Sequence, residues 1–556
     1  MHDRIARFSW LVLLPIVFTS PAVALGEERH DHAAHGAHDV EGLGVVHFPV
    51  SCAPEVQPGF DRAVALLHSF GYEEARLAFQ EVAQRDPSCA MARWGEAMTW
   101  YHPIWAPPTP TELAAGAAAA EAAAALPAKT ERERAWVAAI GTLYRDRDKL
   151  DHRTRAQAYE EAMRQLRERY PDDTEATIFY AMLGTAPSAD GNLDRQKRSA
   201  AILEPLLAKQ PRHPGPVHYL IHAFDYPQTA SLALGAARIY AGIAPESAHA
   251  RHMPSHIFTR LGLWEESIAS NWSSAEAAQA FADRNHAGTT AFDAMHAYDY
   301  LEYAYLQLGQ DDKAREVMER VGGVRRLDNP AAFQAGYALT AVPARYALER
   351  RQWKEAAALA EPAIALDWTG FRYAQAAVAF ANAVGAARGG DPAGARKAVE
   401  RLAAVRAALA AAPPAGSYDW VSQVESLRLA ASGWLARAEK RDDEAVRLLT
   451  QAAELEERVG KHPVTPGAIL PAREQLGDLL LELGRPADAL AAYEADLAAA
   501  PNRFNGLAGA ARAAEGAGRR ERAAELAAAL RALCRAPACT RDGALVEQPA
   551  RASHRR

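Results

Sequence analysis

The sequence is poor in aromatic residues and in cysteine, and it carries no surplus of positive charge. Aromatic residues make up 8% of the 556 residues, and cysteine occurs 4 times. Lys and Arg together number 62 against 69 Asp and Glu, so the formal net charge is −7. Proteins that bind nucleic acid neutralise phosphates with a basic patch, and this balance supplies none. We therefore expect no nucleic-acid partner.

Motifs of the common enzyme classes are also absent. The sequence holds no HExxH, no GxSxG, no phosphate-binding P-loop and no GxGxxG that follows a strand. These absences leave the catalytic residues unknown and predict no nucleotide cofactor. They favour a binding protein over an enzyme.

Long apolar runs are lacking beyond the first residues, so the mature chain is expected to have no transmembrane segment. At the start, basic residues precede an apolar run at 11–18, and a small-x-small pattern that ends at Ala24 follows. This order is typical of a cleaved signal peptide, here residues 1–24. The alternative is a membrane anchor, but the run is too short to span a bilayer and contains Pro15. The sequence predicts a periplasmic or secreted protein.

The cysteines are few but even in number, and an exported protein keeps disulfides. Cys52, Cys89, Cys534 and Cys539 allow three pairings. The most local pairing joins Cys52 to Cys89 and Cys534 to Cys539, and the alternative is four buried thiols. A Cys52–Cys89 disulfide would hold down the leading loop.

Histidines crowd the segment after the signal peptide. Residues 25–46 hold His30, His32, His35 and His38 among Asp, Gly and Ala. Such a polar segment cannot bury a core, so we expect it to be disordered. It suits a metal-scavenging tail, and the alternative is a solvated linker with incidental histidines.

Alanine is abundant, which predicts an almost entirely helical chain. Ala75-x3-Phe79 followed by Pro87 matches the second half of a tetratricopeptide repeat (TPR). Two separations between successive anchors equal the 34-residue period of this repeat. The anchors, the small residues of the predicted second helices, are Ala75, Ala233, Ser267, Ala314, Ala356, Ala445, Ala489 and Ala523.

Helix pairs of this kind bury their apolar faces against their neighbours. The predicted fold is all-α: a TPR-like α-solenoid of stacked antiparallel helix pairs that form a right-handed superhelix with a concave groove. Phe79, Trp94 and Leu476 are expected in its core. The predicted organisation is a signal peptide (1–24), a His-rich disordered segment (25–46), N-terminal repeats with a divergent helical region (47–213), central repeats with a His-rich groove (214–330), C-terminal repeats (331–534) and a disordered tail (535–556).

Histidines stand in register on the first helices of consecutive repeats. Two HxxxH pairs lie 34 residues apart, His218 with His222 and His252 with His256. Residues four apart project from the same face of a helix, so each pair can act together. The same stripe of candidate metal ligands also carries His249, His296, Asp299 and Asp225.

Three interpretations of this stripe compete. Imidazoles four apart on a helix are good paired metal ligands, which favours copper or zinc, and a nearby Asp could ligate or orient an imidazole. The second interpretation is a metal-free groove that binds a peptide or protein segment, as an interaction scaffold of the cell envelope. The third is structural, with buried histidines satisfied by backbone carbonyls. A metal-dependent enzyme would follow only from the first.

Polar residues occupy the same stripe in other repeats. A concave face lined with such side chains predicts a ligand groove, although a solvated face is the commoner explanation for any single charge. The candidate groove residues are Tyr303, Arg345, Glu474, Asp478 and Arg512.

Several longer segments resemble exported bacterial TPR proteins. These segments are FPVSCAPEVQ, CAMARWGEAM, HYLIHAFD, HMPSHIFTRLG, KHPVTPG and PNRFNG, and the resemblance runs from His47 to Cys534. It implies the TPR fold, export and a ligand on the concave face, and it implies no particular reaction. On this sequence it places the histidine stripe and Asp299 in the groove. Pro254 departs from a regular first helix, which leaves the relative aim of His252 and His256 open.

Overall fold

Alanine-rich helices account for nearly all of the structure, a computed structural model that describes residues 38–40, 42–104, 107–186, 192–412, 418–535 and 539–541. All of these residues fall in one compact unit. The predicted signal peptide and His30, His32 and His35 lie outside the described residues.

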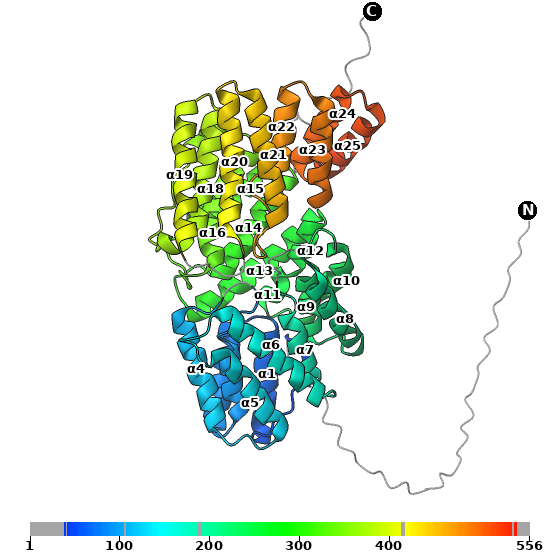
Figure 1. The fold of residues 1–556 in the computed structure, drawn as a ribbon. Coiled ribbons are helices and arrows are strands. Elements are labelled where there is room, and N and C mark those ends of the chain that lie inside the picture. Colours follow the sequence, from blue (N-terminus) through cyan, green and yellow to red (C-terminus); the bar gives the residue numbers. More distant parts are fainter. Residues whose placement is uncertain are drawn as a thin grey trace, which may run out of the picture. The chain divides into compact units, whose positions relative to one another are not determined.

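Helices follow one another along the whole described chain (Figure 1). The N-terminal ones are α1 (Gln57–His68), α2 (Tyr72–Arg85), α3 (Ala90–Met98), α4 (Pro110–Ala125), α5 (Glu131–Tyr144), α6 (His152–Arg169), α7 (Thr174–Leu183) and α8 (Asp194–Lys209). The central ones are α9 (Pro214–Phe224), α10 (Leu234–Ile243), α11 (Ala248–His252), α12 (Pro254–Arg260), α13 (Trp264–Asn285), α14 (Phe292–Gln307) and α15 (Asp311–Gly322). The C-terminal ones are α16 (Phe333–Glu349), α17 (Trp353–Ala357), α18 (Arg372–Arg388), α19 (Pro392–Ala411), α20 (Trp420–Ala438), α21 (Asp442–Val459), α22 (Ala472–Glu482), α23 (Pro486–Ala499), α24 (Phe504–Gly516) and α25 (Arg520–Leu533).

Short 3₁₀ helices and one small hairpin complete the described elements. The 3₁₀ helices are η1 (Pro54–Val56), η2 (Ala230–Ala233) and η3 (Trp368–Phe371). Strands β1 (His38–Val40) and β2 (Gly44–Val46) pair antiparallel.

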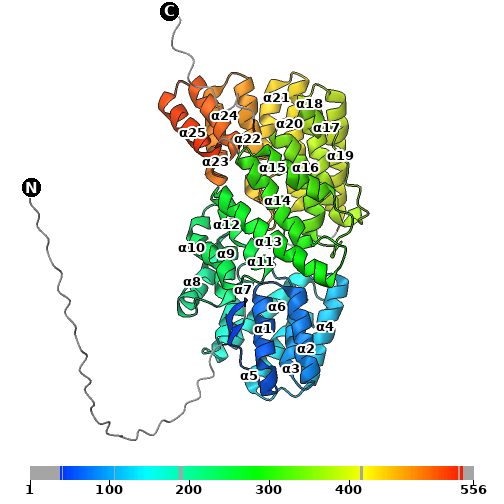
Figure 2. The ribbon, with the colours of Figure 1, turned by 180° about the vertical axis from the view of Figure 1, so that it is seen from behind.

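The helices stack as pairs, which confirms the predicted all-α, TPR-like solenoid. In the C-terminal part the two helices of each pair pack against each other: α18 against α19, α20 against α21, and α24 against α25. The first helices of successive pairs also pack on one another in the order α14, α16, α18, α20, α22, α24. The N-terminal helices also pack as pairs, α1 with α2, α3 with α4 and α5 with α6, and they lie together in the view from behind (Figure 2).

Local sequence explains where helices begin and why they pack closely. Thr109 and Glu112 form a capping box at the start of α4, which satisfies free backbone N–H groups. The eight predicted anchors are all buried, with exposed fractions from 0% to 6%. A small side chain at each lets neighbouring helices approach closely, and Phe79, Trp94 and Leu476 fill the core as predicted.

The prediction of disorder for residues 25–46 is wrong for its last part. Within this segment, strands β1 and β2 at residues 38–40 and 44–46 form a hairpin, and Leu43 and Val46 are buried. The backbone N–H groups of Val45 and Glu246 donate to the carbonyls of Arg212 and Gly42, so the hairpin is tied to the region around α9. Burial of the Leu43 and Val46 side chains stabilises the hairpin within an otherwise polar segment.

The predicted disordered tail likewise begins too early. Cys539, Thr540 and Arg541 are described and lie against the start of α15. Thr540 N donates to Gly309 O at 2.8 Å, and the buried Arg541 pairs with Asp311 at 2.7 Å. The Cys534–Cys539 disulfide holds this turn.

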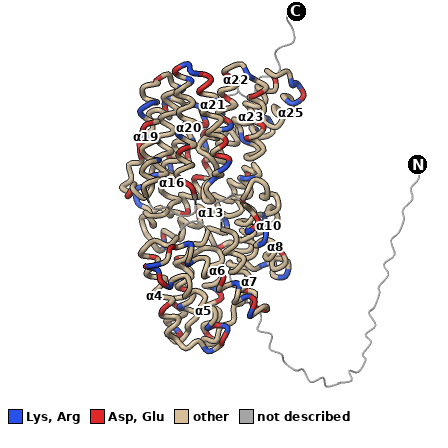
Figure 3. The backbone as a smooth tube through the Cα atoms, in the orientation of Figure 1, with Lys and Arg blue, Asp and Glu red and all other residues tan. Residues whose placement is uncertain are grey.

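Both predicted disulfides are present. Cys52 is bonded to Cys89, and Cys534 is bonded to Cys539. Among the described residues, no helix combines the length and the hydrophobicity that a membrane span requires. Lys and Arg are interspersed with Asp and Glu along the tube (Figure 3), in line with the near balance of charge in the sequence.

Candidate metal centre

Four helices bring the six predicted histidines together. α9 carries His218 and His222, α11 carries His249 and His252, α12 carries His256, and α14 carries His296. The helix breaks at Met253, and Pro254 starts α12 at a position where a proline needs no hydrogen bond. Across the break, His252 and His256 still point toward each other, with their Nε2 atoms 3.0 Å apart. The relative aim of these two side chains, which the sequence left open because of Pro254, is therefore fixed.

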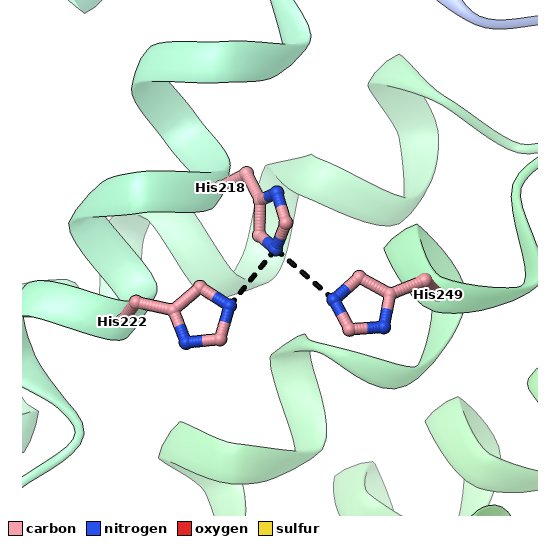
Figure 4. Close-up of side chains that lie close together, drawn as sticks. All are labelled: His218, His222 and His249. Carbon is pink, nitrogen blue, oxygen red and sulfur yellow. Dashed lines mark hydrogen bonds between the residues drawn. The ribbon is translucent and has the colours of Figure 1, made fainter. Parts of the chain in front are cut away.

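His218, His222 and His249 form the first cluster (Figure 4). The Nε2 atom of His218 lies 3.0 Å from Nε2 of His222 and 3.1 Å from Nε2 of His249. On its other side, Nδ1 of His218 donates to the backbone carbonyl of His68 at 2.6 Å. Because a neutral imidazole carries one hydrogen, this bond leaves Nε2 of His218 as a bare lone pair that points between the other two rings.

His252, His256 and His296 form the second cluster. One nitrogen of each ring lies within 4.8 Å of the others, and the rings of His252 and His296 have centroids 4.1 Å apart. The Nε2 atoms of His252 and His256 are 3.0 Å apart.

The hydrogens of this second pair are fixed by what lies behind the rings. Nδ1 of His252 faces the amide oxygen of Asn271 at 2.7 Å, and the amide nitrogen of Asn271 donates to Ser267 O. Nδ1 of His256 faces a carboxylate oxygen of Asp225 at 2.9 Å. Both partners only accept, so both Nδ1 atoms carry the hydrogen. In the neutral rings the two Nε2 lone pairs therefore face each other, which is repulsive unless a cation lies between them.

The spacing suits a metal ion. Two nitrogens that bind one ion at about 2.0–2.1 Å are separated by roughly 3.3–3.4 Å at a tetrahedral angle and by roughly 3.0 Å at an angle near 95°. In metal sites, the ring nitrogen that does not bind the metal usually donates its hydrogen to a carboxylate or carbonyl oxygen, which fixes the orientation of the ring. The two clusters adjoin, since the ring centroids of His222 and His256, and of His249 and His252, are 6.3 Å apart.

Burial keeps these imidazoles neutral. It lowers the pKa of His218 and of His252 well below 6.5, and neighbouring histidines lower both further. Burial also lowers the pKa of His256, although Asp225 opposes this shift. A neutral imidazole is the form that binds a metal.

Asp225 supports the site instead of contributing to the ligand groups, so its prediction as a ligand is corrected. Burial would raise the pKa of its carboxyl group, but Lys461 and Arg260 outweigh burial and hold it well below its usual range. The carboxylate receives Arg260 Nε at 2.9 Å and Lys461 Nζ at 3.2 Å in addition to His256. Both of its oxygens accept from these donors, Oδ1 from Arg260 and Oδ2 from His256 and Lys461.

A third histidine group provides an internal contrast. The carboxylate of Glu175 lies 2.8 Å from His68 Nε2 and 2.9 Å from His213 Nε2. Tyr219 OH lies 2.9 Å from Nδ1 of His68, and Gly215 N donates to Nδ1 of His213. Every ring nitrogen here has a complementary partner with one hydrogen per ring. This group is satisfied without a metal.

Asp299 does not join the histidines, which corrects the second predicted carboxylate ligand. Its carboxylate accepts from Arg345 at 2.9 Å, and Glu302 accepts from the same nitrogen at 2.7 Å. Arg345 is fully buried, so it is part of an internal ion cluster and does not line a groove as predicted. Burial raises the pKa of Glu302 to about 8 despite Arg345.

The remaining predicted groove residues are Tyr303, Glu474, Asp478 and Arg512, and the two carboxylates among them are paired with arginines. Glu474 is buried and accepts from Arg503 at 3.0 Å, whose NH1 also donates to Tyr303 at 2.7 Å. Asp478 accepts from Arg351 and from Tyr493. Among the five, Tyr303 alone is in a described cavity wall, and Arg512 is exposed. A sequence pattern gives the face of a helix but not whether another helix covers it.

Two adjoining cavities lie beside the clusters. One, of about 550 Å³, is lined by His222, Asp225 and Lys461 among others, so it reaches the first cluster. The other, of about 540 Å³, extends from Arg260 and Lys461 to Tyr303 and the helices beyond. Solutes in the first cavity can therefore reach the histidines.

Several supporting residues were missed in the sequence. Asn271 lies one turn after the anchor Ser267 on the buried face of α13, a position where a polar side chain signals a buried partner. Lys461 stands in the KHPVTPG segment, but its pairing with Asp225 spans 236 residues. Phe70, whose φ of 55° is in the left-handed region, packs its ring 4.4 Å from that of His218. The sequence carries no local signal for the last two contacts.

Comparisons with known proteins add little to this geometry. The sequence matches no protein-family model, and no curated protein matches it. Among solved structures, the fold is similar to that titled "Crystal structure of APC/C hetero-tetramer Cut9-Hcn1", with a TM-score of 0.32 and 11% identity over 88% of this chain and 89% of that chain. At this level the likeness carries no functional argument.

The ion cluster around Arg345 predicts a pH-dependent stability difference. With a pKa of 4.5 when unfolded and about 8 when folded, Glu302 costs the folded protein increasing stability as pH rises from 4.5 to 8. We expect Glu302→Gln to remove this cost, of order 3–5 kcal/mol. The Tm of the variant, relative to the parent, should rise between pH 5 and pH 8 and then level off.

Glu316→Gln is the matched control, because Glu316 is exposed and pairs with Lys313. Its Tm difference should stay small across the range. A Tm difference for Glu302→Gln that does not change between pH 5 and pH 9 would contradict the prediction.

Proposed function

We propose that this protein is an exported TPR protein that binds transition metal ions, copper or zinc, at the two histidine clusters. The single observation that carries the proposal is the 3.0 Å contact between the Nε2 atoms of His252 and His256, while both Nδ1 atoms donate elsewhere. A cation between the two lone pairs turns this repulsion into attraction. Imidazole nitrogen suits both metals, and copper binds such ligands most strongly among the common divalent ions.

The alternative is a metal-free interaction scaffold of the cell envelope. Without a metal, one imidazole of the pair would have to hold an extra proton. That imidazolium would be buried, and the cations Lys461 and Arg260 already surround the carboxylate behind it. A metal ion would instead bind both Nε2 lone pairs, and a nitrogen of His296 lies close enough to be the third ligand.

Location outside the cytoplasm is part of the proposal. The leading segment has the order of a signal peptide, and the two disulfides suit an oxidising compartment. A periplasmic or secreted protein meets copper and zinc that the cytoplasm keeps scarce.

A second candidate function, metal-dependent catalysis, has one observation in its favour. Three histidines per ion leave a coordination position for water or substrate. His222 lines the cavity of about 550 Å³, so such a position in the first cluster would be accessible.

Metal content tests the proposal directly. The mature chain, loaded with copper or zinc and dialysed, is expected to retain about two ions by elemental mass spectrometry, one for each three-histidine cluster. His218→Ala with His222→Ala, and His252→Ala with His256→Ala, should each lose about half of the metal, because each pair belongs to one cluster.

His213→Gln is the matched control, since His213 belongs to the satisfied group, and a chain that lacks residues 25–37 tests the His-rich leading segment. Both should keep the full metal content. Metal that is absent from the parent, or that disappears only with residues 25–37, would contradict the proposal.

Asp225→Asn tests the support behind the second cluster. The neutral amide supports His256 less well and leaves Lys461 and Arg260 without their carboxylate, so metal affinity should fall by about 10–100-fold. Competition with a chromophoric chelator measures this change. Asp419 lines the cavity of about 550 Å³ together with Asp225. Asp419→Asn is therefore the control and should not alter metal affinity. Equal affinities for the parent and Asp225→Asn would count against Asp225 as the support.

The candidate catalytic role predicts an open coordination position. Azide added to the copper(II)-loaded chain should bind there and give a new azide-to-copper absorption band. The variant His218→Ala with His222→Ala should lack this band, because it removes the cluster that faces the cavity. An unchanged spectrum of the loaded parent would exclude an accessible position and with it this second candidate.

A further inference from the structure

The cavity of about 540 Å³ has an aromatic wall that the metal proposal does not use. It is built from successive first helices of the stack: α14, α16, α18 and α20. The rings of Tyr373 and Trp420 are stacked with centroids 4.4 Å apart, and Tyr418 lies edge-on to Trp420 at 4.8 Å. Tyr303 and Tyr337 continue the wall. Aromatic faces of this kind attract cations.

Carboxyl groups line another part of the same cavity. Asp496 on α23 is only 7% exposed, and its Oδ2 atom has no hydrogen-bond partner among the described residues. The nearest cationic nitrogen among them, Nε of Arg503, is 3.8 Å away. Glu456 on α21 also lines the cavity, and its Oε1 accepts from the backbone N–H of Ala472 at 2.9 Å.

The cations near this wall are already engaged. Arg503 donates to Glu474 at 3.0 Å and also pairs with Glu349. Arg473 makes two bonds of 2.7 Å to Glu457. Arg260 and Lys461, which also line the cavity, both pair with Asp225 as described above. Among the described residues, the buried Asp496 and the half-buried Glu456 are therefore carboxyl groups without a closely bound cation.

The 3.8 Å contact with Arg503 compensates the buried Asp496 carboxylate only in part, because a buried ion pair is well tolerated when it also has good hydrogen bonds. An ammonium or guanidinium group in this cavity would pair with Asp496 and lie against the aromatic rings. We propose that the cavity between α14, α16, α18, α20 and α23 binds an organic cation, an amine or guanidinium group carried by a small molecule or by a peptide side chain.

The proton equilibria agree with this geometry. Burial raises the pKa of Asp496 to about 7, with Arg503 opposing the shift, and burial raises the pKa of Glu456 to about 7 as well. These carboxyl groups are therefore poised to ionise when a cation approaches. The site does not involve the histidine clusters, so it does not depend on the metal proposal.

Calorimetric titration of the mature chain tests this site with three probes: phenethylamine, its neutral counterpart 2-phenylethanol, and the peptide acetyl-Gly-Arg-Gly-amide. We expect at least one cationic probe to bind at least about tenfold more tightly than 2-phenylethanol, in line with the affinity scale for one charged contact. Tighter binding of phenethylamine would identify a small amine as the ligand class, and tighter binding of the peptide would identify a guanidinium side chain.

Asp496→Asn keeps the shape of the side chain and removes its charge, so binding of the cation should weaken about tenfold or more. Glu494→Gln is the matched control on the same helix, because Glu494 is exposed and pairs with Arg522, and it should bind as the parent does. Circular dichroism checks that each variant folds. If Asp496→Asn does not fold, Glu456→Gln replaces it with the same expected weakening.

Three results would overturn the proposal. The first is that neither cationic probe binds at millimolar concentration. The second is that 2-phenylethanol binds as tightly as the cations. The third is that a folded Asp496→Asn variant, or a folded Glu456→Gln variant in its place, binds the cation as tightly as the parent.

Discussion

The carboxylate of Asp225 is the constraint on which the histidine clusters and both cavities depend. Asp225 is the C-cap residue of α9, three residues after His222, and its carboxylate accepts from His256, Arg260 and Lys461. One buried carboxylate thus fixes the tautomer of a ring in the second cluster and the position of the loop that carries Lys461. A group with three such donors cannot move without breaking several charge-assisted bonds, so these parts are held as a unit.

The stripe of histidines divides into two clusters within α11, before the break at Met253. His249 and His252 are three residues apart on a helix that ends at His252, so their rings diverge by about 60° around the helix axis. His249 turns toward α9 and His252 toward α14. His252 and His256 are four residues apart on either side of the break, and their Nε2 atoms are 3.0 Å apart, as are those of His218 and His222 on the unbroken helix α9. The proline therefore leaves the second HxxxH pair intact.

Much of the fold and the six histidines could be predicted because both follow from helical and repeat periodicity. Periodicity fixes which face of a helix a side chain lies on, and this sufficed to place His218 beside His222 and His252 beside His256. It does not fix partners from distant segments: Asp299 pairs with Arg345, and Lys461 reaches Asp225 across 236 residues. Nor does it give the hydrogen on each ring, which depends on backbone carbonyls and amides behind the histidines.

The two cavities share part of their charged lining and differ in the rest. The shared lining carries Arg260 and Lys461 on the side of the histidines, whereas Asp496 and Glu456 lie in the wall of the aromatic cavity alone. Arg260 and Lys461 are both paired with Asp225, so a cationic ligand would be held by Asp496 and the aromatic rings and not by the shared lining. The cation site and the histidine clusters can therefore act independently although their cavities adjoin.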